Sequence, residues 1–259
     1  MNAIGIIPAR LGASRFPGKP LEKMLGMPMV GHCYHRSRLA PGLHSTYVAT
    51  CDKAIADYIC SIGGRAIMTS DRHTRATTRT AEALDIIEQE TGERVDIVVM
   101  VQGDEPLISP ETIGDTLGGF SHDSIEIVNV MSRLKTLGAF QDKNNVKVVV
   151  NQDNDALYFS REAIPSPWKG WKHLPRYMQT GIIAFRRDTL IAFNSMEESP
   201  LEQIESVDMN RVIETGGRIR MVLTEAQTIG VDTREELLEA ERLLQYDPVV
   251  EKYLTKCGC

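Results

Sequence analysis

The first part of the chain alternates short apolar runs with segments of helical pattern, and this alternation constrains the fold more than any other feature of the sequence. Apolar runs that predict buried strands occupy residues 3–9, 45–51, 65–70 and 95–101. Helical patterns lie between them, at residues 28–40, 53–64 and 78–92. Strands that alternate with helices in this way predict an α/β fold with a mostly parallel sheet flanked by helices.

The second half of the chain changes character. Two strand-like runs within residues 145–161 are joined by a turn at Asp153–Asp155, which indicates a β-hairpin. The segments expected after it are a loop at 166–177, a strand at 180–187, a helix at 199–217, a strand at 218–225 and a helix at 231–245. Thr233 stands where an N-cap belongs, with Glu236 three residues later. We expect one domain spanning residues 1–259, with an inserted hairpin lobe at about 145–187 that serves as a lid or a dimerisation element.

Composition excludes several classes of function. The 259 residues carry a formal net charge of -6, which argues against non-specific nucleic-acid binding, because such binding needs a basic surface. No apolar run approaches the length of a membrane span, and the N-terminus lacks the pattern of a signal peptide, so we expect a cytoplasmic protein. All five cysteines are expected to be reduced, and the first three are expected to lie in packed segments. The C-x-C pair Cys257 and Cys259 lacks the partners of a zinc site.

The loop after the first strand, within IIPARLGASRFPGKPL (residues 6–21), combines glycines with cationic and hydroxyl groups. Its glycines are Gly12 and Gly18, and its polar groups are Arg10, Ser14, Arg15 and Lys19. Glycines allow close approach of the backbone to a ligand, and exposed N–H groups with cations suit a polyphosphate. The loop matches neither the Walker A nor the G-x-G-x-x-G pattern. A solvated basic loop is the alternative interpretation.

Two acidic motifs also follow strands. Asp104 and Glu105 in VQGDEP (101–106) come directly after an apolar strand, and Asp232 in IGVDT (229–233) precedes a helix. Taken separately, they could be a turn acid and a helix cap. Because ligands of such sheets bind beyond the carboxyl ends of the strands, the two aspartates and the cationic loop together predict a metal–triphosphate site.

The ordered motifs IIPARxxSxRxPGKPL, VQGDEP, NxVKVV, ALYFSRxxIP, SPLExIE and GVDT resemble those of the CMP-Kdo synthetase (3-deoxy-manno-octulosonate cytidylyltransferase) family, over residues 3–245. This resemblance implies a Rossmann-like sugar-nucleotidyltransferase fold and a homodimer. It also implies an enzyme that couples CMP from CTP to an acidic sugar, Kdo or a related ulosonic acid, with Mg²⁺ as cofactor and release of pyrophosphate. The implied pathway is the supply of lipopolysaccharide or capsule.

The resemblance also assigns roles by position. The implied triphosphate contacts are Arg10, Ser14, Arg15 and Lys19, and the implied nucleotide contacts are Thr77, Arg79 and Gln102. Asp104 and Asp232 would bind Mg²⁺, and with Arg15 and Lys19 they form the implied catalytic set. In the acceptor site, Arg161 would face the sugar carboxylate, beside Gln179 and Asp208. The implied mechanism is direct attack of the anomeric hydroxyl on the α-phosphorus of CTP.

Two regions depart from the family pattern. Arg75-Ala76 stands where Ser-Gly is usual in the loop beside the pyrimidine ring, which bears on base selectivity and could bring an arginine to a phosphate. Gln179, Ile183 and Asp208 replace a histidine, a tyrosine and a glutamate of the sugar pocket. Lost hydrogen-bond partners change selectivity strongly, so the acceptor could be a different acid, such as a phosphonate.

Three further alternatives stay open on the sequence. The first is a nucleotidyltransferase that uses UTP, GTP or ATP, whose signature loop is usually richer in glycine. The second is a glycosyltransferase with a D-x-D metal motif, which Asp104-Glu105 does not match. The third is a catalytically silent relative that binds nucleotide, against which the retained cations and aspartates argue.

Overall fold

The computed structural model describes residues 1–12, 15–226 and 228–254, which divide into two compact units. The first unit comprises residues 1–114 together with the C-terminal segment from residue 228 onwards. The second unit comprises Asp115–Ala226. The predicted hairpin lobe at 145–187 therefore lies within a larger unit that begins 30 residues before it.

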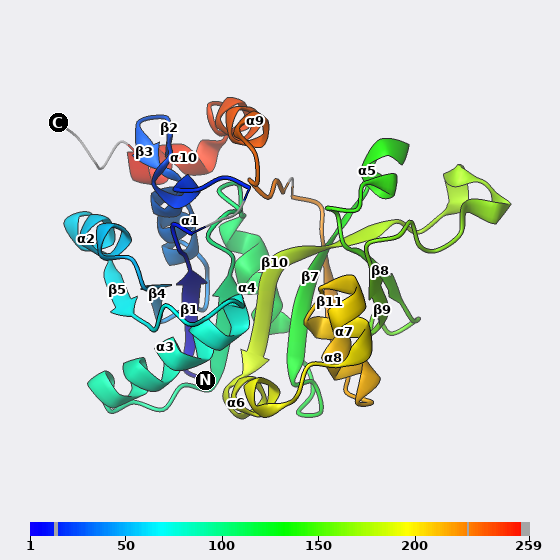
Figure 1. Ribbon diagram of the computed structural model, residues 1–259, viewed down its shortest axis with the longest axis horizontal. Helices are drawn as coiled ribbons and strands as arrows, with labels where there is room; N and C mark the ends of the chain where they lie inside the picture. Colours follow the sequence, from blue (N-terminus) through cyan, green and yellow to red (C-terminus); the bar gives the residue numbers. More distant parts are fainter. Residues whose placement is uncertain (13–14, 227, 255–259) are drawn as a thin grey trace. The chain divides into compact units, whose positions relative to one another are not determined.

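A four-stranded parallel sheet forms the centre of the first unit, in the order β6-β1-β4-β5 (Figure 1). Its strands are β1 (Ala3–Pro8), β4 (Ser45–Thr50), β5 (Arg65–Met68) and β6 (Ile97–Val101). In β1, Ile6 pairs with Tyr47 on one side and Met100 on the other. All of β6 is buried, as expected for a parallel strand with both faces covered. The prediction of a parallel α/β sheet from the apolar runs is confirmed.

Helices and short elements complete the first unit. They are η1 (Lys19–Leu21), β2 (Lys23–Met24), β3 (Met27–Pro28), α1 (Met29–Arg38), α2 (Lys53–Ser61), α3 (Ala76–Thr91), α9 (Arg234–Leu244) and α10 (Pro248–Leu254). Helix α4 (Pro110–Gly118) crosses the boundary between the units along the chain. The helices predicted for this unit are confirmed to within a few residues. Thr233 and Glu236 form the predicted capping box at the start of α9.

A separate hydrophobic cluster holds the C-terminal helices in place. It packs α9 and α10 against the β2–β3 hairpin, and Figure 1 shows these elements side by side. Leu107 and Val231 belong to this cluster, and each lies close in sequence to one of the predicted metal ligands. The Val231 N–H donates a hydrogen bond of 2.8 Å to the Asp104 carbonyl. The packing thereby joins two loops that are far apart along the chain.

The second unit has a mixed sheet, in which β7 lies between β11 and β10. Its elements are β7 (Ile127–Arg133), α5 (Leu137–Gln141), β8 (Lys147–Val150), β9 (Ala156–Ser160), η2 (Pro167–Lys169), η3 (Trp171–His173), β10 (Tyr177–Arg186), α6 (Arg187–Ser195), α7 (Pro200–Glu205), α8 (Met209–Glu214) and β11 (Arg220–Thr224). Strand β11 is parallel to β7, whereas β10 is antiparallel to it.

The predicted hairpin is confirmed and branches from β10. Strands β8 and β9 pair antiparallel, and β8 also pairs with Tyr177 and Met178 at the start of β10. The turn places Asn154 at a φ of 59°. Asparagine enters this left-handed region more readily than most residues, which explains why the Asp-Asn-Asp turn signal was sound.

The prediction of a single helix over residues 199–217 is wrong. The structure has two short helices, α7 and α8, because Ser206 adopts the left-handed conformation with a φ of 53°. Each helix has its own contacts with β9. Glu205 accepts hydrogen bonds from residues at the end of β9, and the Asn210 side chain exchanges hydrogen bonds with the Phe159 backbone. These contacts outweigh the continuous helical pattern of the sequence.

Two smaller expectations concern membranes and thiols. Within the described ranges, none of the helices has the length and apolarity that a membrane crossing requires. Cys33 is buried, Cys51 half-buried and Cys60 exposed, and all three are free thiols. The expectation of a packed position is therefore wrong for Cys60. Cys257 and Cys259 lie outside the described residues.

Candidate active site

A pocket in the first unit gathers most of the predicted nucleotide-binding residues. It lies at the carboxyl ends of β1 and β6, where open parallel sheets bind ligands. Its lining residues are Pro8, Ala9, Arg10, Arg15, Lys19, Pro20, His73, Thr74, Arg75, Ala76, Arg79, Gln102, Gly103, Asp104 and Asp232. Five cationic side chains face two carboxylates in this set, a balance that suits a polyphosphate.

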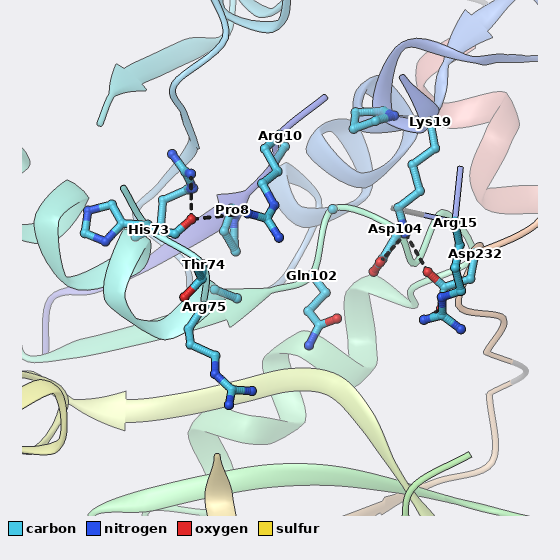
Figure 2. Close-up of a pocket in the computed structure, with 15 residues that line it drawn as sticks. Pro8, Arg10, Arg15, Lys19, His73, Thr74, Arg75, Gln102, Asp104 and Asp232 are labelled. Atoms are coloured by element: carbon cyan, nitrogen blue, oxygen red, sulfur yellow. Dashed lines mark hydrogen bonds and ion pairs between the residues drawn. The ribbon is translucent and has the colours of Figure 1, made fainter. Parts of the chain in front are cut away.

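One side of the pocket is a group that we name the lysine–carboxylate cluster: Lys19, Asp104, Asp232 and Arg15 (Figure 2). The Lys19 Nζ donates to Asp104 Oδ2 at 2.7 Å, to Asp232 Oδ1 at 2.9 Å and to the Val231 carbonyl at 2.7 Å. Arg15 Nη2 donates to the other Asp232 oxygen at 2.7 Å. The cluster confirms that the cationic loop and both predicted metal ligands lie together.

The local backbone explains why these loops meet. A Cβ atom on Gly103 would lie 3.0 Å from the Pro8 carbonyl, so a glycine lets the loop after β6 approach the end of β1 closely. The Asp232 N–H donates to Glu236 Oε2 at 2.7 Å, which ties Asp232 to the capping box of α9. The sequence indicates Glu236 as a capping residue only, because its second contact, with Asp232, depends on the conformation of the loop.

Lys19 is charged at neutral pH in this environment. Burial lowers its pKa, but the attraction of Asp104 and Asp232 outweighs burial, and the net pKa lies above the usual lysine value. The side chain is only 10% exposed, so the ammonium group depends on protein partners for its solvation.

The opposite side of the pocket includes His73, Thr74 and Arg75, which Figure 2 shows near Arg10 and which belong to the segment of residues 69–75. Arg10 Nη1 donates to the His73 carbonyl at 3.3 Å. Arg79 Nη1 donates to Thr69 Oγ1 at 2.6 Å and to the Ser70 carbonyl at 3.2 Å. Arg79, predicted as a nucleotide contact, lines the pocket, and its guanidinium also holds this segment through the Thr69 hydroxyl and the Ser70 carbonyl.

A second interaction fixes the same segment, and it was not visible in the sequence. His73 Nε2 forms a short contact with Glu82 Oε2, and Glu82 Oε2 also accepts from the Ser70 N–H at 3.0 Å. Burial raises the pKa of Glu82, but the hydrogen bonds from Ser70 and His73 outweigh it and lower the pKa overall. The carboxylate form of Glu82 therefore orders the segment that carries Thr74 and Arg75.

One predicted nucleotide contact, Thr77, does not line the described part of the pocket. Thr77 is 1% exposed and is not one of the lining residues in the part of the chain that the structure describes. It lies in the first turn of α3, whose helical geometry turns it inward. Ser14 lies outside the described residues. Arg75, which the sequence suggested could reach a phosphate, lines the pocket.

The predicted acceptor residues all belong to the second unit. Arg161 donates from Nε to the Glu205 carbonyl at 2.7 Å and from Nη1 to the Lys143 carbonyl at 3.0 Å. Gln179 and Asp208 are half-buried, Gln179 in β10 and Asp208 at the start of α8. Ile183 is 2% exposed and has no polar group, so it offers no hydrogen bond to an acceptor.

Glu205 organises the backbone at Arg161. It accepts hydrogen bonds from the Arg161 N–H at 2.8 Å and from the hydroxyls of Ser160 and Tyr158 at 2.7 and 2.9 Å. Burial raises its pKa, but these hydrogen bonds outweigh burial, so the folded-state pKa lies below the usual value of 4.5. The stabilisation from Glu205 is then fully present above pH 4.5 and is lost as the pH falls through the lower folded-state pKa.

This linkage predicts the acid sensitivity of a Glu205→Gln variant. Because glutamine does not titrate, the free energy of unfolding should fall less for this variant than for the wild type between about pH 6 and about pH 3. Urea denaturation at both pH values measures the difference. Glu126→Gln, at an exposed position of the same unit, is the control and should follow the wild type. Equal acid losses for Glu205→Gln and the wild type would contradict the assigned pKa shift.

The carboxylates of the lysine–carboxylate cluster fit the needs of a magnesium ion. Among the described residues, no group of three or more histidine, cysteine, aspartate or glutamate side chains is arranged to hold a metal. Mg²⁺, however, takes only one or two carboxylates and completes its shell with phosphate oxygens and water. Asp104 and Asp232 place carboxylate oxygens 2.7 and 2.9 Å from one cationic atom, Lys19 Nζ. The donor set therefore suits an ion that arrives with a triphosphate.

Comparisons with known proteins agree with this geometry. A family model described as Cytidylyltransferase matches residues 4–221. The 3-deoxy-manno-octulosonate cytidylyltransferase of Geobacter metallireducens is 40% identical, over 97% of this chain and 98% of its own length. The chain belongs to the 3-deoxy-manno-octulosonate cytidylyltransferase family. It is a nucleotidyltransferase. The alternative interpretations of this cytidylyltransferase as a D-x-D glycosyltransferase or as a catalytically silent relative are therefore rejected.

Solved structures confirm the predicted fold of this cytidylyltransferase. CMP:2-keto-3-deoxy-manno-octonic acid synthetase complexed with CTP has a TM-score of 0.86 and 35% identity, covering 95% of this chain and 99% of its own. A cytidylyltransferase from Leptospira borgpetersenii, at 17% identity and a TM-score of 0.64, covers 100% of this chain and 96% of its own. The second likeness concerns the fold alone.

Proposed function

We propose that this cytidylyltransferase transfers CMP from CTP to 3-deoxy-manno-octulosonate and releases pyrophosphate. The observation that carries the proposal is the lysine–carboxylate cluster, set in a chain that aligns nearly end to end with relatives of that name. A cationic pocket with two carboxylates suits phosphoryl chemistry, in which catalysis consists mainly of positioning and charge neutralisation. The hypothesis of a changed acceptor stays as an alternative outcome of the assay below.

The pocket residues suggest how the reaction proceeds. Arg10, Arg15 and Lys19 would pair with phosphate oxygens and offset the charge that develops on the departing pyrophosphate. Gln102, at the end of β6, would lie beside the nucleotide. The anomeric hydroxyl of the acceptor would attack the α-phosphorus in line with the leaving group, without a covalent enzyme intermediate. This mechanism needs no nucleophilic side chain.

Magnesium is the proposed cofactor. Asp104 and Asp232 would hold it, and when bound it would neutralise phosphate charge and acidify the attacking hydroxyl. In the acceptor site, Arg161 would face the sugar carboxylate, and Gln179 and Asp208 would contact the sugar. Their polar side chains would set which acid is accepted, since unmatched hydrogen-bonding groups discriminate strongly. We further propose a homodimer that acts in the cytoplasm and supplies lipopolysaccharide synthesis.

A matrix of substrates tests the proposal. Pyrophosphate release is measured with Mg²⁺ and each of the four nucleoside triphosphates, against a panel of acids that includes Kdo and a phosphonate. We expect release with CTP and Kdo, and little with the other nucleotides. Faster release with another acid would identify that acid as the substrate in place of Kdo. Acceptor selectivity would then be assigned to Gln179 and Asp208. Preference for UTP, GTP or ATP would overturn the choice of CTP and would indicate that Arg75-Ala76 changes the base selectivity.

A further inference from the structure

Lys19 has its full set of hydrogen-bond partners within the protein. An ammonium group has three hydrogens, and the Lys19 Nζ donates to three oxygens, those of Asp104, Val231 and Asp232, at 2.7, 2.7 and 2.9 Å. Its side chain is 10% exposed. A buried ammonium that leaves such partners without replacement loses the solvation that they provide. Lys19 therefore moves readily only when other anionic oxygens take over.

The same two carboxylates are the ones proposed to hold the metal ion. Asp104 pairs with Lys19, whereas Asp232 pairs with both Lys19 and Arg15. The cluster thus pairs two negative charges with two positive charges. A divalent ion that approached it would meet an ammonium already in contact with both of its ligands, and Mg²⁺ gives up its own water reluctantly.

We propose that Lys19 and a divalent metal ion compete for the carboxylates of Asp104 and Asp232, so that the ion is admitted only with the triphosphate. Phosphate oxygens are the replacement partners that allow Lys19 to leave the carboxylates. The negative charge of the triphosphate then neutralises both the Lys19 ammonium and the divalent ion. This inference rests on the proposed use of CTP and a divalent ion. It gives Lys19 a second function, as the residue that keeps metal off the site before nucleotide binds.

The exposures of the two cations make the proposal specific. The Arg15 side chain is 56% exposed, so solvent screens its pairing with Asp232. Lys19 is buried and contacts both carboxylates. Removing the Lys19 charge should therefore strengthen metal binding by a large factor, and removing the Arg15 charge by a small one. A residue that served only to bind phosphate would have no such effect on metal alone.

The test is binding of Mn²⁺, as a paramagnetic substitute for Mg²⁺, to the protein without nucleotide. Lys19→Met and Lys19→Gln should each bind Mn²⁺ more tightly than the wild type, on the order of tenfold. Arg15→Met should gain less than about threefold. Lys53→Met, which removes an exposed lysine paired with Asp57, is the matched control and should leave Mn²⁺ affinity unchanged. Adding Asp104→Asn to Lys19→Met should abolish the gain.

A second arm adds CTP. The wild type should then bind Mn²⁺ much more tightly than it does alone, whereas the Lys19 variants should gain less because their site is already open to metal. Equal or weaker Mn²⁺ binding by both Lys19 variants would overturn the proposal. If the Lys19 gain is seen but CTP has no effect in the wild type, the competition stands and the proposed nucleotide fails. No acceptor is present, so these results do not depend on Kdo.

Discussion

Replacing Asp104 with asparagine is expected to lower kcat for pyrophosphate release on the order of 1000-fold, the largest effect on activity that the structure predicts. Asparagine keeps the size of the side chain but removes the negative charge. The variant would therefore lose a proposed metal ligand and an ion-pair partner of Lys19 at 2.7 Å. Because the Asp104 carbonyl also accepts from Val231 through the backbone, the loop itself should keep its place.

Steady-state kinetics with CTP, Mg²⁺ and the best acceptor measure this effect. The reduction should fall mainly on kcat, because the missing charge is needed most when charge builds up on the leaving group. Asp57→Asn makes the same chemical change at an exposed ion pair of the first unit and should leave kcat unchanged. An Asp104→Asn enzyme within tenfold of the wild type, with unchanged thermal unfolding, would exclude Asp104 from the metal site.

Replacing Glu202 with alanine should produce the largest loss of stability, about 3–5 kcal/mol. Glu202 is fully buried, and both of its carboxylate oxygens accept from Arg211 at 2.6 Å. Arg211 is 6% exposed, and its guanidinium lies over the Phe193 ring with 4.5 Å to the ring centroid. The hydrogen bonds that Arg211 donates to Glu202 raise the pKa of Arg211. Without Glu202 the guanidinium still keeps its charge, because arginine does not deprotonate in proteins. Alanine would leave that charge buried and unpaired.

An exposed pair with similar geometry provides the control. Arg242 donates two hydrogen bonds to Glu239, at 2.8 and 2.7 Å, but both side chains are about half exposed. Urea denaturation followed by circular dichroism should show a large fall in midpoint for Glu202→Ala and no measurable change for Glu239→Ala. Similar midpoints for the two variants would mean that burial does not set the strength of these pairs. Glu202→Gln, which keeps one carbonyl acceptor, should lie between the two.

Much of the fold follows from local patterns in the sequence. Continuous apolar runs predict β1 and β6, because a strand buried on both faces must be apolar throughout. The helical spacing of apolar residues predicts the helices between these strands. Turn chemistry predicts the β8–β9 hairpin, and a capping box predicts the start of α9. The site was predictable to the same extent, since acids and cations that follow strands of a parallel sheet gather at one edge.

The failures share a different cause. The helical pattern over 199–217 gives no sign that Ser206 takes a left-handed conformation, which follows from the docking of α7 and α8 on β9. Arg79 lines the pocket, but its hydrogen bonds to the Thr69 hydroxyl and the Ser70 carbonyl could not be predicted, because they join α3 to a segment whose path depends on tertiary packing.

The sequence by itself determined which chemical groups this cytidylyltransferase has and at which strand ends they lie, because periodicity and loop composition are local properties. Only the tertiary structure decided how those groups pair. Lys19 and Asp232 are 213 residues apart, and their contact exists because Leu107 and Val231 are packed into one hydrophobic cluster. Packing is a property of the whole chain, so the bridge from Lys19 to both carboxylates could be found only in three dimensions.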